Sequence, residues 1–222
     1  QQLNIMPRPK KSSDDRYGLS FIFMMPEPYQ PVMTGHANGV ITLNASEADV
    51  VYRETTRIKM GENYRTLLGH FRHESGHYYF DLMIAQKADL IEEFRSLFGD
   101  ERQDYSEALK KHYNEGPPTD WQSRFVSSYA STHPWEDWAE TWAHYLHMMD
   151  TLNTATGFGI QLAETQFDLI PFTKKALYAP GDREAEEFLK IINHWIELVA
   201  MLNALSRSIG QLDLYPFVLS AA

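Results

Sequence analysis

The sequence predicts a mainly helical α+β fold, with a small N-terminal sheet packed against helices. Residues 19–24 and 39–44 are short, apolar and partly β-branched, and they are predicted as strands. Residues 183–209 have apolar side chains at three-and-four spacing, which predicts a long amphipathic helix. Helical patterns dominate the chain from Ser46 onwards, so we expect few strands beyond these two.

The other elements are predicted from their caps and breakers. Ser46 and Asp49 resemble a capping box, and glycines or prolines end several segments. We expect helices over 46–60, 63–85, 89–98, 105–113, 119–129 and 134–156, and a loop with short helical turns over 160–181.

The bulk composition favours one globular domain. The chain has 222 residues, of which 43% are hydrophobic and 23% are charged. Residues 1–17 are polar and contain Pro7 and Pro9, so we expect an extended segment or linker remnant there and a single domain over 18–222.

Charge and residue usage exclude several classes of partner. The formal net charge of −10 argues against a broad nucleic-acid footprint or an anionic membrane surface. No stretch approaches about 18 uninterrupted apolar residues, so no transmembrane helix is predicted. The chain has no cysteine, which fits a reducing compartment, and we expect it in the cytoplasm. Because it opens on Gln1 without a signal-peptide pattern, we expect a fragment whose first segment has been removed.

The strongest chemical signal is an H-E-x-x-H motif within residues 67–81, formed by His73, Glu74 and His77. Positions i and i+4 lie on the same helical face, so the two imidazoles can converge on one metal ion. Glu74 would lie beside them. A carboxylate at that place can accept a proton from a water molecule that zinc has made more acidic.

A third ligand is expected on the helix predicted over 134–156. Catalytic zinc normally takes three protein ligands, and Glu136, Glu140, His144 and His147 form a polar stripe on this otherwise apolar helix. We assign Glu136 to the metal. Glu140 lies one turn later, where it could accept a hydrogen bond from a ligand imidazole and fix its tautomer. The alternative, with Glu140 as the ligand, stays open.

The two motifs resemble those of known metallopeptidases. The H-E-x-x-H helix, the later E-x-x-A-E helix and the intervening S-Y-A-x-x-x-P-x-E run are similar to the gluzincin group, particularly the catalytic domain of anthrax lethal factor. The strings G-H-F-R-H-E-S-G-H-Y and H-P-W-E-D-W-A-E-T-W-A-H-Y-L-H resemble the bacterial family of putative zinc-binding metallopeptidases. Members of that family usually carry an N-terminal cysteine-rich zinc ribbon, which this chain lacks.

The resemblance implies a zincin-like domain that hydrolyses peptide bonds with one Zn²⁺ per chain. By the resemblance His73, His77 and Glu136 would hold the ion and Glu74 would be the base. Tyr129 would donate a hydrogen bond to the oxyanion, because a neutral phenol can strengthen its bond as negative charge develops. The alternative for Tyr129 is a tyrosine of the core or of an interface.

Further residues are assigned around this site. Asp81, one turn after His77, is a candidate for hydrogen bonding near the ligands, and His70 is a candidate for the same role or for the rim of the substrate site. The strand over 39–44, through Gly39, Val40 and Ile41, is expected to be an edge strand that pairs with an extended peptide substrate. Three further expectations concern single residues: His36 is structural, Gly76 marks the close passage of a neighbouring element, and His133 is more often a surface group than a substrate contact.

Two other functions were weighed against the peptidase. A ferritin-like di-iron protein needs two E-x-x-H pairs, and Glu140 and His144 are one residue too far apart for the second. A non-catalytic binding or regulatory module that keeps zinc for structure is the more serious alternative. A structural site usually has four ligands rich in thiolates, however, and coordination alone does not need Glu74.

Overall fold

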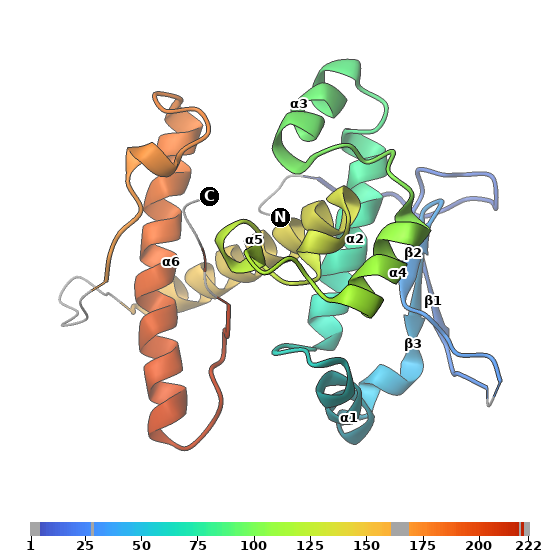
Figure 1. Ribbon diagram of the computed structural model, residues 1–222, viewed down its shortest axis with the longest axis horizontal. Helices are drawn as coiled ribbons and strands as arrows, with labels where there is room; N and C mark the ends of the chain where they lie inside the picture. Colours follow the sequence, from blue (N-terminus) through green and yellow to red (C-terminus); the bar gives the residue numbers. More distant parts are fainter. Residues whose placement is uncertain (1–4, 28, 161–168, 218, 220–222) are drawn as a thin grey trace. The chain divides into compact units, whose positions relative to one another are not determined.

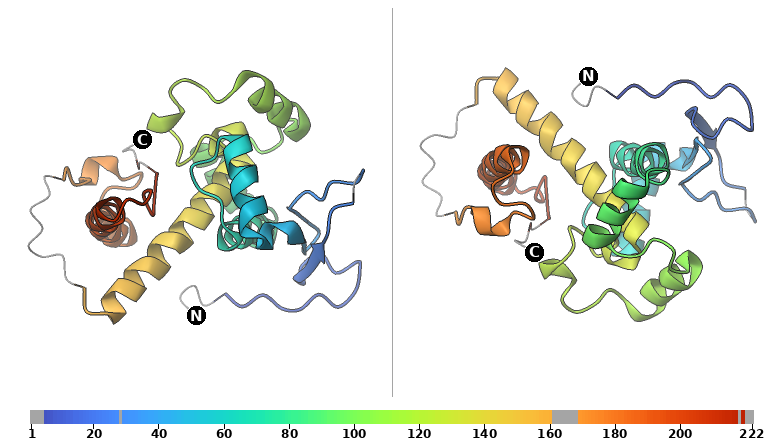
Figure 2. Two further views of the ribbon diagram at one scale, coloured as in Figure 1. Left: turned by 90° about the horizontal axis from the view of Figure 1, so that it is seen from below. Right: turned by 90° about the horizontal axis from the view of Figure 1, so that it is seen from above.

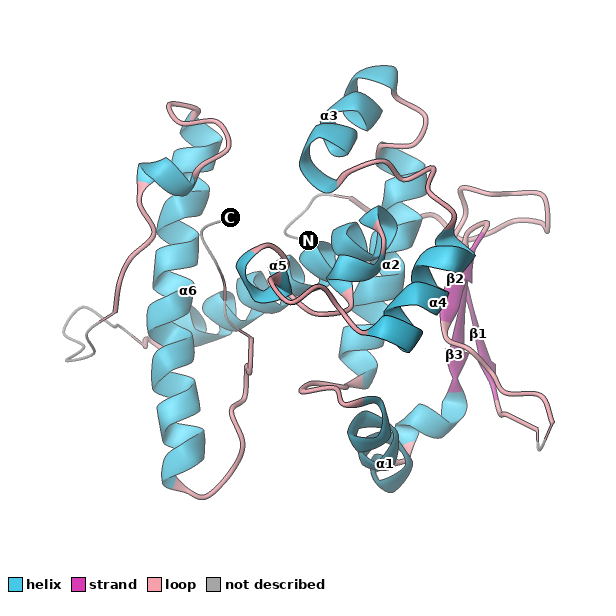
Figure 3. Cartoon of the chain, in the orientation of Figure 1, coloured by secondary structure: helices cyan, strands magenta, loops and turns pink. Residues whose placement is uncertain are grey.

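The computed structural model describes residues 5–27, 29–160, 169–217 and 219. Within these residues it has six α-helices and one three-stranded sheet, which confirms the mainly helical α+β class (Figures 1 and 3). The chain forms two compact units, one made of residues 1–118 and 127–143 and the other of residues 119–126 and 144–222. The division into a segment 1–17 and one domain 18–222 stays a prediction.

The sheet of the first unit has the strand order β1-β3-β2. Its strands are β1 (Ser20–Met24), β2 (Gly35–Ala37) and β3 (Val40–Asn44). β1 is parallel to β3, with Ser20 opposite Val40, and β2 is antiparallel to β3. The turn between β2 and β3 uses positive φ at Asn38 and Gly39, as a tight hairpin requires. A Cβ at Gly39 would lie 2.1 Å from the Gly18 carbonyl oxygen, so only glycine fits there.

Both predicted strands are present, and β2 is an additional one. The expectation that the strand over 39–44 lies at the edge of the sheet is wrong, because β3 has neighbours on both sides. β2 is too short to give a periodic signal in the sequence.

The helices of the first unit are η1 (Ala45–Ala48), α1 (Val50–Met60), α2 (Leu67–Met83), α3 (Ala88–Phe98), α4 (Tyr105–Glu115), η3 (Ala130–Thr132) and the first part of α5 (Pro134–Gly157). Several of them begin at a side-chain cap. Asp49, Thr66 and Asp104 each accept a backbone N–H from the first turn that follows. The helix predicted from residue 46 therefore starts as a 3-10 turn, and the one predicted from 63 starts at Leu67.

Aromatic side chains form the core of the first unit. Phe80, Ile84 and Phe94 are buried, and side chains of α3 and of the start of α5 pack against them. The opposite side of α2 faces the sheet through β2 and β3 (Figure 1). α2 is thus covered on two sides, which fixes the helix that carries the H-E-x-x-H motif.

The helix predicted over 119–129 is wrong. Only Trp121–Ser123 forms a 3-10 turn, η2, in that stretch. The hydroxyl of Ser127 accepts the N–H of Ala130, and that of Ser131 donates to the carbonyl oxygen of Ser128. Such local bonds compete with the helical backbone pattern.

The second unit contains η2, the later part of α5, η4 (Lys174–Ala176) and α6 (Arg183–Ser208). Met148, Trp195, Val199 and Tyr215 form its buried cluster. The helix predicted over 183–209 is confirmed. Among the described residues α6 alone is long and apolar enough to cross a membrane by length and composition, a test that core helices also pass. The expectation of no transmembrane helix therefore stays a prediction.

Candidate metal centre

The start of α2 is held in place by a buried ion pair. Glu47 is 2% exposed, and the guanidinium of Arg65 donates to both of its carboxylate oxygens. A second carboxylate, that of Glu62, receives Nη1 of Arg65 at 2.9 Å. The chain entering α2 is therefore fixed two residues before its first helical turn.

α2 and the first part of α5 cross each other (Figure 2), and they pass unusually close at Gly76. A Cβ at this position would lie 2.9 Å from the Cα of Ala139, which confirms the expected close neighbour. The indole of Trp138 donates to the carbonyl oxygen of Gly76 at 2.8 Å, and that of Trp142 to the Ser75 hydroxyl at 3.1 Å. Gly76 lies between the two histidines of the motif, so the contact places these histidines beside α5.

Three donor atoms converge at this crossing, two from α2 and one from α5. Nε2 of His73 lies 3.2 Å from Nε2 of His77 and 3.0 Å from Oε2 of Glu136. Nε2 of His77 lies 3.6 Å from the same oxygen. A tetrahedral ion with ligands at about 2.0–2.1 Å separates its ligand atoms by about 3.3 Å. The three residues could therefore hold one metal ion.

The remaining hydrogen bonds of His73 leave Nε2 available to a cation. Its Nδ1 lies 2.7 Å from Oε1 of Glu140, and Oε2 of Glu140 accepts the Ser127 hydroxyl at 2.6 Å. With the proton on Nδ1, a neutral His73 presents an Nε2 lone pair to the Glu136 oxygen. Two lone pairs at 3.0 Å repel unless a proton or a metal ion lies between them.

The electrostatics of the metal-free site match this arrangement. Burial alone would lower the pKa of His73, but the neighbouring carboxylates of Glu136 and Glu140 outweigh it and raise that pKa well above 6.5. Burial would raise the pKa of Glu136, yet His73 and His77 hold it well below 4.5. Without a metal a proton takes the cation's place, as expected of a ligand set that binds metal in competition with protons.

Glu136 is also bound by a residue that the sequence analysis missed. The hydroxyl of Tyr105, the first residue of α4, donates to Oε1 of Glu136 at 2.6 Å. Oε2 of Glu136 is buried, and it has no geometrically sound hydrogen bond within the described part of the chain. The sequence did not single out Tyr105 among the twelve tyrosines of the chain. Its contact with Glu136 depends on how the chain folds.

Glu74 lies in the same cavity without a hydrogen-bond partner for one oxygen. The cavity has a volume of about 340 Å³ and is lined by side chains of α2, α4 and α5, by Tyr129 and by β2. Oε2 of Glu74 is buried and unpartnered among the residues described. Burial raises the pKa of Glu74, while His73 and His77 oppose that shift. A carboxylate in this state is suited to accept a proton.

Tyr129 lines the cavity, with its ring centroid 6.0 Å from that of His73. Burial is the largest cause that raises its pKa, followed by the charge of Glu136. Tyr129 also forms a hydrogen bond with Tyr105. Because the Tyr105 hydroxyl donates its one proton to Glu136, Tyr129 is the donor in this bond. Tyr129 is therefore a neutral hydroxyl at the cavity wall.

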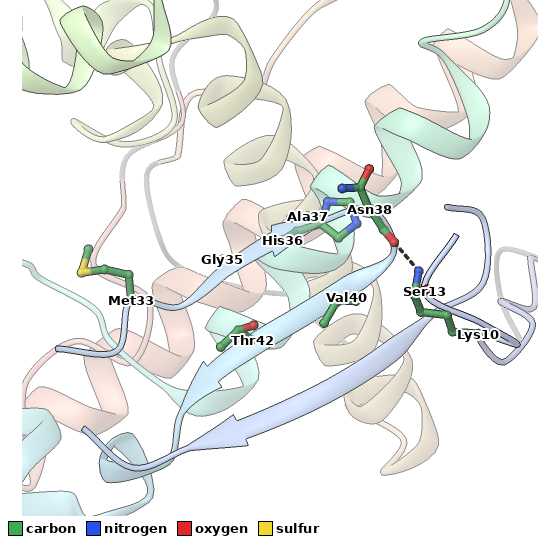
Figure 4. A pocket seen from close by; sticks show the side chains of 9 residues that line it. All are labelled: Lys10, Ser13, Met33, Gly35, His36, Ala37, Asn38, Val40 and Thr42. Atoms are coloured by element: carbon green, nitrogen blue, oxygen red, sulfur yellow. Dashed lines mark hydrogen bonds between the residues drawn. The ribbon is translucent and has the colours of Figure 1, made fainter. Parts of the chain in front are cut away.

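The strand that borders the cavity is β2, not β3. Gly35, His36 and Ala37 line it, and they also line a second hollow together with Lys10 and Ser13 (Figure 4). β3 pairs with both neighbours, and its Ile41 is fully buried. The assignment of substrate pairing to Gly39, Val40 and Ile41 is corrected for this reason.

The other predicted histidines lie in different surroundings. His36 accepts the N–H of Gly39 through Nε2, and burial lowers its pKa to about 4. His133 is buried, where Nδ1 accepts the Trp135 N–H and Nε2 lies 3.2 Å from the Gln103 carbonyl oxygen. The expectation of a surface residue at His133 is wrong. His144 lies 2.7 Å from the Tyr215 hydroxyl in the second unit, with His147 beside it.

Asp81 and His70, the two residues expected to form hydrogen bonds near the ligands, lie in different surroundings. Asp81 lines the cavity, and burial raises its pKa, opposed by His77. His70 faces Glu47 instead, with Nε2 3.7 Å from Oε2, and burial lowers its pKa to about 4. His70 thus belongs to the surroundings of the Arg65 ion pair, and Asp81 to those of the donor cluster.

Comparison with known proteins gives a family. The family model described as "Putative zinc-binding metallo-peptidase" matches residues 1–222. Proteins of Mycobacterium bovis and of two strains of Mycobacterium tuberculosis, described as uncharacterized, are 48% identical to the chain over 217 residues. The match covers 98% of this chain and 60% of each relative, so the chain spans 60% of the length of these relatives. No solved structure matches the chain.

Proposed function

We propose that this chain, which belongs to the family of zinc-binding metallopeptidases that matches its whole length, is a zinc-dependent peptidase of the gluzincin type. His73, His77 and Glu136 would hold one zinc ion. Glu74 would be the general base, and Tyr129 would stabilise the oxyanion. The similarity to the catalytic domain of anthrax lethal factor belongs to this proposal.

One observation carries the proposal: a complete set of three metal donors lies beside a carboxylate, that of Glu74, which is not itself one of the donors. The three donor atoms have the mutual separations of tetrahedral ligands. Glu74 borders the same cavity and is not among the three donors. A purely structural metal site needs no such residue, whereas hydrolysis does.

The chemistry follows from the placement of these residues. Zinc, when bound, lowers the pKa of water and polarises a carbonyl group. Glu74 accepts a proton from the attacking water and returns it to the leaving amine, so the peptide C–N bond breaks with no net proton change on the protein. The Tyr129 hydroxyl donates a hydrogen bond to the carbonyl oxygen as negative charge develops there.

An extended substrate would bind along β2. This strand borders the cavity and pairs with β3 along one side. The peptide substrate would add a strand on the other side of β2, and its side chains would alternate between the cavity and the hollow beside Lys10. We propose a cytoplasmic peptide or protein substrate, because the chain has no cysteine.

The test measures metal content and peptide cleavage on the same samples. We expect one zinc per chain in the wild type, loss of zinc in Glu136→Ala, and a chelator-sensitive cut in an unbiased peptide library. Glu74→Gln should keep its zinc and lose the cut. Glu115→Gln, at the exposed end of α4, is the matched control and should retain both.

Each component of the proposal has its own contrary result. A wild type that binds zinc and cuts nothing would favour a binding or regulatory module over a peptidase. Zinc retained in Glu136→Ala but lost in Glu140→Gln would move the ligand to Glu140. A wild type without metal at neutral pH would overturn the metal site itself.

A further inference from the structure

The carboxylate of Glu136 is held by two different kinds of group, one at each oxygen. Oε1 accepts the hydroxyl of Tyr105 at 2.6 Å. Oε2 faces the imidazoles of His73 and His77 at 3.0 and 3.6 Å. We propose that Tyr105 is a positioning residue that occupies Oε1 and so limits Glu136 to a single-oxygen metal ligand. This inference rests on the proposed zinc site.

The hydroxyl of Tyr105 is a rigid donor. An O–H···O⁻ distance of about 2.5–2.7 Å is typical of a strong, charge-assisted hydrogen bond. The ring begins α4 and packs edge-on against His133, with centroids 5.3 Å apart, and tilted against Trp135 at 6.1 Å. His133 is itself fixed through both ring nitrogens. The donor therefore cannot turn away from Glu136 without disturbing the packing around it.

Restricting Glu136 to one oxygen matters for the number of ligands. A carboxylate with both oxygens free can chelate an ion and occupy two positions. A catalytic zinc site needs three protein ligand atoms and one open position for water or substrate. With Oε1 bound to Tyr105, the atoms that face one another are Nε2 of His73, Nε2 of His77 and Oε2 of Glu136.

Tyr105 also connects Glu136 to Tyr129. Tyr129 donates to the oxygen of Tyr105, and Tyr105 donates to Glu136. The chain of hydrogen bonds runs from the cavity wall to the carboxylate that faces the donor cluster. Removing the central hydroxyl leaves the Tyr129 hydroxyl and Oε1 of Glu136 each without this partner, while the aromatic packing stays the same.

The experiment replaces one hydroxyl and measures the metal, not the reaction. Tyr105→Phe and Tyr113→Phe are compared with the wild type for zinc affinity, by competition with a chromophoric chelator, and for the visible absorption of the Co²⁺-substituted protein. Tyr113 lies on the same helix, 59% exposed, and is the matched control. Circular dichroism of the metal-free proteins checks that all three fold.

We expect Tyr105→Phe to bind zinc about 10- to 100-fold more weakly, the usual effect of removing a partner of a metal ligand. Its cobalt spectrum should lose intensity, because a chelating Glu136 raises the coordination number. Tyr113→Phe should match the wild type in both. Para-aminophenylalanine in place of Tyr105, which keeps a donor at the same position, should restore affinity and spectrum.

Equal affinity and an identical cobalt spectrum in Tyr105→Phe would overturn the positioning role and leave the zinc site intact. A wild type that binds no metal would overturn the proposed site and this role together. If Tyr105→Phe does not fold, the para-aminophenylalanine variant decides. Zinc binding by that variant that is weaker than that of the wild type would count against the positioning role of Tyr105.

Discussion

Adding one methyl group at Gly76 should separate the two helices that carry the donor cluster. The Cβ of Gly76→Ala would lie 2.9 Å from the Cα of Ala139, whereas ordinary contact begins at 3.4 Å. The difference between these two distances, about 0.5 Å, must come from movement of α2 against α5, because the opposing atom is backbone. His73 and His77 would then shift relative to Glu136.

Two opposing effects set the magnitude. Overpacking of a close contact costs about 1–3 kcal/mol. Alanine is better than glycine in a helix by about 1 kcal/mol, which offsets part of that cost. We expect a net loss of about 1 kcal/mol in the free energy of unfolding. For a chain of this size that corresponds to a fall of about 2–4 °C in Tm.

The assay is thermal unfolding of the metal-free protein by circular dichroism, followed by zinc competition. Gly157→Ala at the end of α5 is the control, because its Cβ would meet nothing within 4 Å. Its Tm and zinc affinity should equal or exceed those of the wild type. If Gly76→Ala also melts at or above the wild-type temperature with unchanged zinc affinity, the close crossing does not position the ligands, and the reasoning fails.

Three further predictions concern the groups around the cluster. Glu140→Ala should weaken zinc binding about 10- to 100-fold, since His73 loses the acceptor that fixes its tautomer; Glu140→Gln keeps an acceptor oxygen and should lose less, as measured by chelator competition. Arg65→Met leaves the buried Glu47 carboxylate without its bidentate partner and should cost about 3–5 kcal/mol in urea unfolding, with one zinc still bound per chain. The raised pKa of His73 means that the metal-free folded state binds a proton more tightly than the unfolded chain. Its stabilising contribution is complete below the unfolded pKa of about 6.5 and disappears as pH rises through the folded pKa. Calorimetry should therefore show the metal-free protein losing stability above neutral pH while its zinc affinity rises; a metal-free stability that increases over that range would contradict this sign.

The local elements were largely predictable because their signals lie within a few residues of each other. The amphipathic pattern gives α6, and the apolar β-branched segment gives β3. Where side-chain hydrogen bonds decide the backbone, as at Ser127, the predicted helix is absent. The histidine pair was predictable for the same reason that α6 was, because i and i+4 always share a helical face.

The sequence by itself determined the two histidines, the need for a third ligand, and two glutamates one turn apart that were able to supply it. The tertiary structure alone brought Oε2 of Glu136 to the imidazoles and Glu140 to the other nitrogen of His73. It also brought Tyr105 to Glu136 and put β2, in place of β3, beside the cavity. The physical reason is separation along the sequence. Helical periodicity fixes which residues are neighbours within one turn. The other contacts join segments tens of residues apart, and these segments meet only through the packing of helices and strands.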